Sequence, residues 1–191
     1  MATDPFGNEY RIGLSGHIGI GFQDVVHSRS GQFPSPTIEE QRVPVITRFQ
    51  QVVKDNDRSV KLKGGRLLVS TPDTNNSKVK ALMASWFYNH AKHKFQSILD
   101  EALLKFKKEN IVLERMDIKR MKNRWGSCTN KGVVTLNPEL IKAPSKCIEY
   151  VILHELCHLS VPNHNKEFYA LLENKMPNWK KWKYYLDRTL K

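Results

Sequence analysis

The stretch VILHELCHLSVPNH, residues 151–164, constrains this chain more than any other part of its sequence. In and just before it, apolar residues recur at the spacing of a helix: Ile148, Val151, Ile152, Leu156 and Leu159. This spacing predicts a helix with one face in the protein core, which Pro144 opens and Pro162 ends. Any fold of this chain must therefore bury that face and also accommodate two histidines and a glutamate within five positions.

The sequence HELCH has the spacing of a metal site. His154 and His158 are four residues apart, so on a helix both project from one flank, one turn apart. We expect them to flank the apolar stripe and to hold one metal ion at the rim of the core, where water can reach it. Glu155 projects about 100° round from His154, near enough to act on water at the metal without binding the metal itself.

Neutral imidazoles suit zinc, and a catalytic zinc ion keeps three protein ligands and one water molecule. The helix supplies two ligands, so a third must come from elsewhere. His164 is the preferred candidate because it follows the helix-ending proline, where the chain can turn back towards the ion. Glu167 and Glu173 are the alternatives. The expected cofactor is one Zn²⁺ ion that lowers the pKa of water to about 7, while Glu155 takes the proton of that water and passes it to the leaving group.

A purely structural role for this stretch is the competing interpretation. Two imidazoles and a carboxylate beside the apolar face of a helix are costly to remove from water unless something binds them. The third histidine, at a distance from which the chain can fold back, is a further coincidence that a structural role leaves unexplained. The sequence therefore favours a metal-dependent hydrolase.

The net charge widens the range of substrates. It is +12, from 31 Lys and Arg against 19 Asp and Glu, which suits polyanions such as nucleic acids, although the basic residues are scattered, as on a solubilising surface. In NWKKWKYYLDR, residues 178–188, aromatic rings can stack on bases, but packing is the preferred interpretation. Three functions are compatible with these residues: a metallopeptidase acting on peptides or proteins, a metal-dependent nucleotide (phosphoanhydride) hydrolase, and a nucleic-acid-associated module of a restriction or repair system.

Cysteine usage and hydropathy predict a cytoplasmic protein. Cys128, Cys147 and Cys157 are odd in number and have no CxxC spacing, which argues against a disulfide framework and against a cysteine zinc site. Packing roles are expected for Cys157 and for Cys128, with a redox-sensitive thiol near the site as the alternative for Cys128. No apolar stretch approaches the ~20 residues of a membrane span, so we expect no membrane partner.

The first half of the chain predicts strands and then a long helix. Residues 1–40 are rich in glycine and proline, which indicates turns or bulges in a strand-rich region. The segment RSVKLKGGRLLVS, residues 58–70, predicts a hairpin that turns at Gly64 and Gly65. An amphipathic helix follows, with Ser77 as its N-cap and a core stripe on which His90 is expected to be a structural histidine.

After Asn110 the segments IVLERMDIKRM, RWGSC and VVTLN predict strands, the last two as a hairpin that leads into the HELCH helix. Two further helices are predicted, one up to Pro177 and one from Trp179 to the C-terminus. The order of strands, helix, strands and helices indicates an α+β fold. We expect a strand-rich N-terminal region over residues 1–75 and a catalytic domain over residues 76–191.

The sequence MKNRWGSCTNKGVVTLNPELIKAPSKCIEYVILHELCHL, followed by NHNKEFYALLENKMPNW, resembles the YgjP-like zinc metallopeptidase family, which is related to the Spartan-type and other small zincin-fold proteases. The resemblance extends over about residues 77–191 and rests on the joint presence of RWGSC, HELxHL and NHxxxF. It implies a zincin-like fold with a small mixed or antiparallel sheet packed on the HExxH helix. It also implies that His154, His158 and His164 are the metal ligands and Glu155 is the catalytic base. The resemblance makes a metallopeptidase the preferred function, with the nucleotide hydrolase and the nucleic-acid-associated module as the alternatives.

The resemblance implies further roles outside the HELCH helix. The strand VVTLN is expected at the edge of the sheet above this helix, where an extended peptide can pair with it. Arg124 and Trp125 match the RWGSC element. We expect them to be structural, Trp125 in the core and Arg124 as the partner of a carboxylate, with direct substrate contact as the alternative. Asn165 stands where the family has serine and can cap the next helix equally well.

Overall fold

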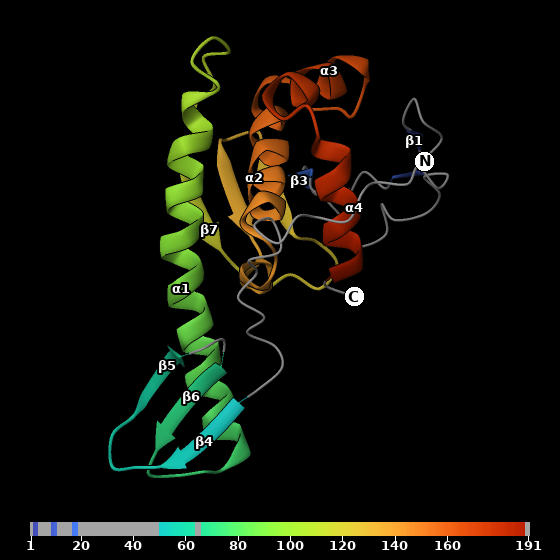
Figure 1. The fold of residues 1–191 in the computed structure, drawn as a ribbon. Helices are drawn as coiled ribbons and strands as arrows, with labels where there is room; N and C mark the ends of the chain where they lie inside the picture. The colour runs from blue at the N-terminus through green and yellow to red at the C-terminus, as the bar shows by residue number, and fades with distance from the viewer. Residues whose placement is uncertain (1, 4–8, 11–16, 19–49, 64–65, 190–191) are drawn as a thin grey trace.

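The computed structural model describes residues 2–3, 9–10, 17–18, 50–63 and 66–189. Most of the region expected to be strand-rich, residues 1–40, and the turn expected at Gly64 and Gly65 lie outside the described residues. The described part contains three small sheets and four α-helices (Figure 1). The predicted α+β class is therefore confirmed.

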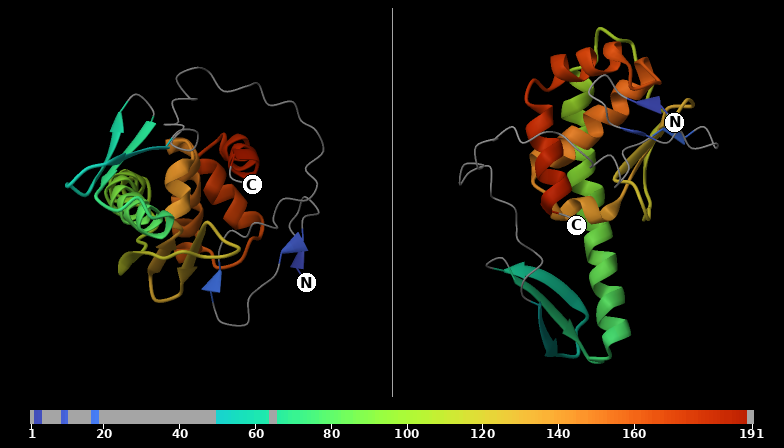
Figure 2. Two further views of the ribbon diagram at one scale, coloured as in Figure 1. Left: turned by 90° about the horizontal axis from the view of Figure 1, so that it is seen from below. Right: turned by 90° about the vertical axis from the view of Figure 1, so that its right-hand side faces the viewer.

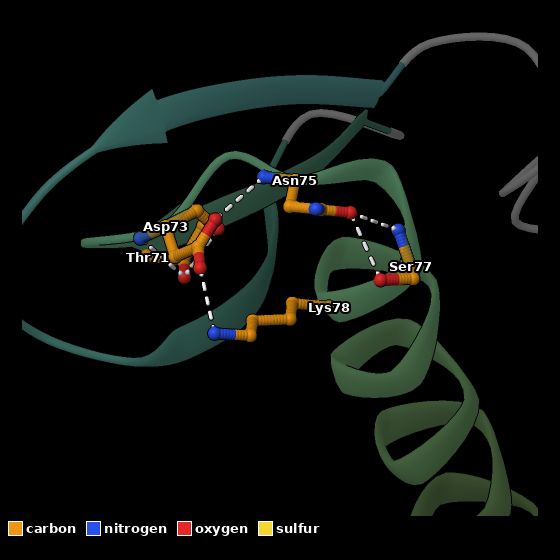
Figure 3. Close-up of polar contacts among 5 residues, drawn as sticks. All are labelled: Thr71, Asp73, Asn75, Ser77 and Lys78. Atoms are coloured by element: carbon orange, nitrogen blue, oxygen red, sulfur yellow. Dashed lines mark hydrogen bonds and ion pairs between the residues drawn. The ribbon is translucent and has the colours of Figure 1, made fainter.

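Helix α1, Asn76–Leu104, is the longest element and runs along most of the molecule (Figure 1). Its N-cap is Asn75, whose Oδ1 accepts hydrogen bonds from Ser77 N at 3.0 Å and from Ser77 Oγ at 2.9 Å (Figure 3). Asp73 Oδ1 accepts a hydrogen bond from Asn75 N at 2.9 Å, and Asp73 Oδ2 lies 2.7 Å from Lys78 Nζ. The prediction of Ser77 as the N-cap is wrong, because Ser77 supplies the N–H that is capped.

The first half of α1 supports a separate three-stranded sheet (Figure 2). Strands β5, Ser59–Lys63, and β6, Arg66–Thr71, pair antiparallel and confirm the predicted hairpin. Strand β4, Gln50–Lys54, pairs in parallel with the other side of β6. The buried apolar residues of this region are Leu67, Val69 and Val79.

The second half of α1 packs into the main core, and its buried residues there begin at Ala91. His90 lies just outside this core. It is exposed, and its ring stacks on that of Trp86, with centroids 4.5 Å apart and 14° between the planes. The prediction that His90 lies on a buried stripe is wrong, because His90 is on the exposed side of α1, while Phe87 and Ala91 on either side of it in the sequence pack against or in the main core.

The four-stranded sheet beside the second half of α1 has the order β3-β8-β9-β7. Its strands are β3, His17–Ile18, β7, Arg115–Ile118, β8, Gly126–Thr129, and β9, Val133–Leu136. The predicted hairpin of β8 and β9 is confirmed. The prediction that VVTLN lies at the edge is wrong, because β7 pairs in parallel with the other side of β9 and encloses it. The outer side of β8 pairs antiparallel with β3. Two further strands, β1, Ala2–Thr3, and β2, Glu9–Tyr10, pair with each other.

Helix α2, Ser145–Ser160, lies at the centre of the main body and contacts α1, β8, α3 and α4 (Figure 2). A short 3-10 helix, η1, Pro138–Lys142, precedes α2, and Pro144 is the N-cap residue of α2. Helices α3, Lys166–Lys175, and α4, Trp179–Thr189, follow as predicted. Every residue of α2 from 150 to 158 is buried. Among the helices described, none is both long and apolar enough to cross a membrane.

Candidate metal centre

Three histidines converge at the C-terminal end of α2. His154 and His158 come from α2, and His164 comes from the loop that joins α2 to α3. The Nε2 atom of His154 lies 2.8 Å from Nε2 of His164 and 3.2 Å from Nε2 of His158. One possible ligand atom from each of the three lies within 4.8 Å of the others. The structure thus brings together the three histidines chosen from the sequence.

The donor atoms fit a zinc ion. Two nitrogen ligands about 2.0 Å from a tetrahedral zinc ion lie about 3.3 Å apart. The Nε2 atoms of His154 and His158 are 3.2 Å apart and match this spacing. Those of His154 and His164 are 2.8 Å apart, so they would separate by about 0.5 Å around the ion. His158 Nδ1 donates a hydrogen bond to the carbonyl oxygen of Val161 at 3.3 Å. This bond places the proton on Nδ1 and leaves the lone pair of Nε2 available to a metal.

The environment keeps the two imidazoles of α2 neutral. Burial lowers the pKa of His154 well below its ordinary value of 6.5, and the nearby His164 and His158 lower it further. Burial also lowers the pKa of His158 to about 3, with His164 as the second cause. Because a metal ion binds neutral imidazole, both side chains are in the binding form at neutral pH.

The centre is more deeply buried than the sequence predicts. His154 and His158 are 5% and 6% exposed, and Glu155 is 0% exposed. The predicted position at the rim of the core is wrong for these side chains of α2. Elements that precede α2 in the sequence, α1 and β8, and elements that follow it, α3 and α4, cover the helix. His164, in its loop, is half-buried and is the most exposed of the three histidines.

Glu155 lies against strand β8. A Cβ atom placed on Gly126 would lie 2.7 Å from Glu155 Oε1 and 2.9 Å from Val151 Cγ1. Both distances are too short for real contacts, so β8 approaches α2 this closely because residue 126 is glycine. Gly126 is not among the candidate residues chosen from the sequence. The signal that indicates it is an isolated glycine in a predicted strand, which often marks a close approach of two backbones.

A second residue that the sequence analysis missed fixes the segment before β8. Asn137 is 1% exposed, and its Nδ2 donates hydrogen bonds to the carbonyl oxygens of Met121 at 2.8 Å and Arg124 at 3.0 Å. Its backbone N–H donates to the carbonyl oxygen of Trp125 at 2.9 Å. Trp125 is 4% exposed and belongs to the main core, whereas Arg124 is half-buried. Substrate contact by these two residues stays a prediction.

The two glutamates considered as third ligands lie elsewhere. Glu167 is exposed, and Glu173 accepts a hydrogen bond from Trp179 Nε1 at 2.6 Å. Among the described residues, the cluster of possible ligand atoms contains neither of them. Asn165 caps α3 as predicted, since its Oδ1 accepts a hydrogen bond from Phe168 N at 3.0 Å.

The cysteines and the tryptophans of α4 have packing roles. Cys128 and Cys157 are 3% and 0% exposed, and burial raises the pKa of each thiol to about 12. A thiol with this pKa is protonated at neutral pH, which favours packing over a redox-sensitive role for Cys128. Trp179 and Trp182 are 5% and 2% exposed. The rings of these two tryptophans fill the core and cannot stack on bases. The packing interpretation is therefore confirmed for Trp179 and Trp182, and likewise for Cys128 and Cys157.

Comparison with known proteins identifies the family. No curated protein matches the chain. The model of the YgjP-like family, described as a metallopeptidase domain, matches residues 28–189 and so begins well before residue 77, where the resemblance read from the sequence begins. This match extends over most of the chain and includes the converging histidines and the buried glutamate of α2. The chain belongs to the YgjP-like metallopeptidase family.

Proposed function

We propose that this chain is a zinc-dependent metallopeptidase whose single metal ion is held by His154, His158 and His164. The observation that carries the proposal is the convergence of three imidazoles within 4.8 Å, on and just after an HExxH helix, in a metallopeptidase family. The fold expected with this function is zincin-like. The contact between β8 and α2 supports that expectation.

The residues around the centre have distinct roles in the proposed reaction. A zinc ion bound by the three histidines would act as a Lewis acid, which would polarise the scissile carbonyl and lower the pKa of water. Glu155 accepts the proton of the attacking water on a carboxylate oxygen and passes it to the nitrogen of the leaving amine. Because Glu155 is 0% exposed, bulk water does not screen its charge. Gly126 allows β8 to lie directly over this carboxylate, which supports its role as a base held in one position.

A peptide or protein is the proposed substrate because the family is described as a metallopeptidase domain. The nucleotide-hydrolase and nucleic-acid alternatives stay predictions, and the burial of Trp179 and Trp182 removes one argument for nucleic-acid binding. A cytoplasmic location also stays a prediction.

The proposal is tested by comparing the wild type with Glu155→Gln, both loaded with zinc, on a peptide library and on a panel of nucleotides. We expect the substitution to reduce peptide hydrolysis at least about 100-fold, because the carboxamide cannot take the proton, while zinc stays bound. Neither protein should hydrolyse nucleotides. Equal peptide hydrolysis by the two proteins would refute the role of Glu155, and nucleotide hydrolysis that the substitution abolishes would favour the alternative substrate.

A further inference from the structure

One aromatic ring contacts all three histidines. Phe168, in the first turn of α3, has its ring centroid 4.8 Å from that of His154, 4.6 Å from that of His158 and 4.6 Å from that of His164. The angles between the planes are 67°, 30° and 63° in the same order, so one imidazole lies tilted over the ring and two meet it nearer to edge-on. Phe168 is 0% exposed, so its ring is enclosed together with the buried imidazoles of His154 and His158 and contacts the half-buried His164.

The backbone of Phe168 is tied to the loop that carries the third histidine. Phe168 N donates to Asn165 Oδ1 at 3.0 Å, and Asn165 is the residue that follows His164. Asn165 N donates in turn to the carbonyl oxygen of Asn163 at 2.8 Å. The start of α3 therefore fixes both the aromatic ring and the chain on either side of His164.

We infer that Phe168 is a positioning residue that holds the three imidazoles in the arrangement a metal ion needs. In the tautomers that bind a metal, the lone pairs of the Nε2 atoms of His154, His158 and His164 face one another and repel. Rotation of any of the three rings relieves this repulsion. A flat side chain packed against all three rings opposes such rotation. The imidazoles then lose less conformational entropy when a metal ion binds, and the affinity for the metal rises.

The inference rests on the metal site proposed above but concerns metal binding rather than hydrolysis. The test variant is Phe168→Leu, and the control is Leu172→Val. Leu172 is also 0% exposed and lies one turn further along the same helix, so both substitutions remove buried apolar volume from α3. Two quantities are measured on the 191-residue chain: zinc affinity, by competition with a chelator, and the visible absorption spectrum of the cobalt(II)-substituted protein.

We expect Phe168→Leu to weaken zinc binding 10- to 100-fold, the range found when groups that orient metal ligands are removed. The cobalt(II) bands should weaken or shift, because the imidazoles no longer hold one arrangement. Leu172→Val should bind zinc within about threefold of the wild type and keep its spectrum. Phe168→Met replaces the flat ring with a flexible side chain of about the volume of leucine and should lose affinity in the same way, which gives a second test where the leucine variant does not fold.

Wild-type affinity and an unchanged spectrum in both Phe168 variants would overturn the inference. Equal losses of affinity in Phe168→Leu and Leu172→Val would also overturn it, because they would reduce the effect to general packing. Failure of the wild type to bind zinc would remove the inference together with the proposed site. A wild type that binds zinc but hydrolyses no peptide would sink the proposed function alone, and the comparison of variants would still decide the role of Phe168.

Discussion

Gly126 shows how a single residue determines the distance between the sheet and helix α2. Alanine at this position would place a methyl carbon 2.7 Å from Glu155 Oε1, so either β8 or the carboxylate has to move. We expect Gly126→Ala to lower kcat/KM for peptide hydrolysis at least tenfold, because a displacement of about 1 Å at a catalytic group can reduce the rate about 100-fold. Zinc affinity should change less than threefold.

The control for this substitution is Ser127→Ala, which alters the next residue of β8 without adding volume. It should keep most of the peptidase activity. Full activity in Gly126→Ala would show that the close approach of β8 to Glu155 has no catalytic consequence. A loss of zinc from Gly126→Ala would instead show that the substitution disturbs the whole of α2.

The third metal ligand is a choice between two single residues, His164 and Glu173. We expect His164→Ala to lose most of its bound zinc, because two imidazoles on a helix leave a zinc ion with too few protein ligands. Glu173→Gln should bind zinc as the wild type does, since Glu173 contacts Trp179 rather than the histidines. Bound zinc per chain and its affinity decide between them. Retained zinc in His164→Ala, with loss in Glu173→Gln, would reverse the assignment.

At the scale of elements, the N-caps of two helices offer a matched comparison. Asn165 caps α3 beside the histidines, and Asn75 caps α1 at the far end of the molecule (Figure 1). Alanine at either position should lower the free energy of unfolding by about 1 kcal/mol, as measured by urea denaturation. Asn165→Ala should also weaken zinc binding several-fold, because the cap fixes the loop of His164. Equal zinc affinities of the two variants would contradict this link.

Local sequence patterns predicted most helices and strands correctly, but they did not predict which distant strands pair with each other. The helices follow from apolar spacing and prolines, and the two hairpins follow from short turns between strands. The position of β9 inside its sheet depends on a parallel pairing with β7, for which no local pattern exists. The N-cap of α1 was misplaced because Asn75 and Ser77 are both good capping residues.

The three histidines of the candidate metal centre could be predicted from the sequence, but the packing of the whole molecule around them could not. Helical spacing and the proline after α2 sufficed to select the three histidines. The deep burial of His154 and His158 depends on α1, β8, α3 and α4 packing around α2, which the sequence of α2 alone does not indicate. The division of the chain at residue 75 stays a prediction, and α1 extends from the small sheet into the main core.

This burial makes the stability of the metal-free protein depend on pH. The pKa values of His154 and His158 in the folded chain lie below the ordinary value of 6.5, so at acid pH the unfolded chain binds more protons than the folded chain. Stability is therefore complete above pH 6.5 and is lost as the pH falls through 6.5 towards the folded pKa of His158, about 3. Each histidine contributes up to about 1.4 kcal/mol per pH unit.

The window between pH 6.5 and 5 isolates the histidines. Salt bridges to lysines also lower the pKa of Glu109 and Glu149, but from 4.5, so the stability they provide is lost at lower pH. Urea denaturation of the metal-free chain should give a free energy of unfolding that falls between pH 6.5 and 5. The fall should be smaller in His158→Gln and unchanged in His90→Gln, because His90 is exposed. The same fall in all three proteins would show that α2 does not hold its imidazoles neutral, and with it the premise of a metal site ready at neutral pH would fail.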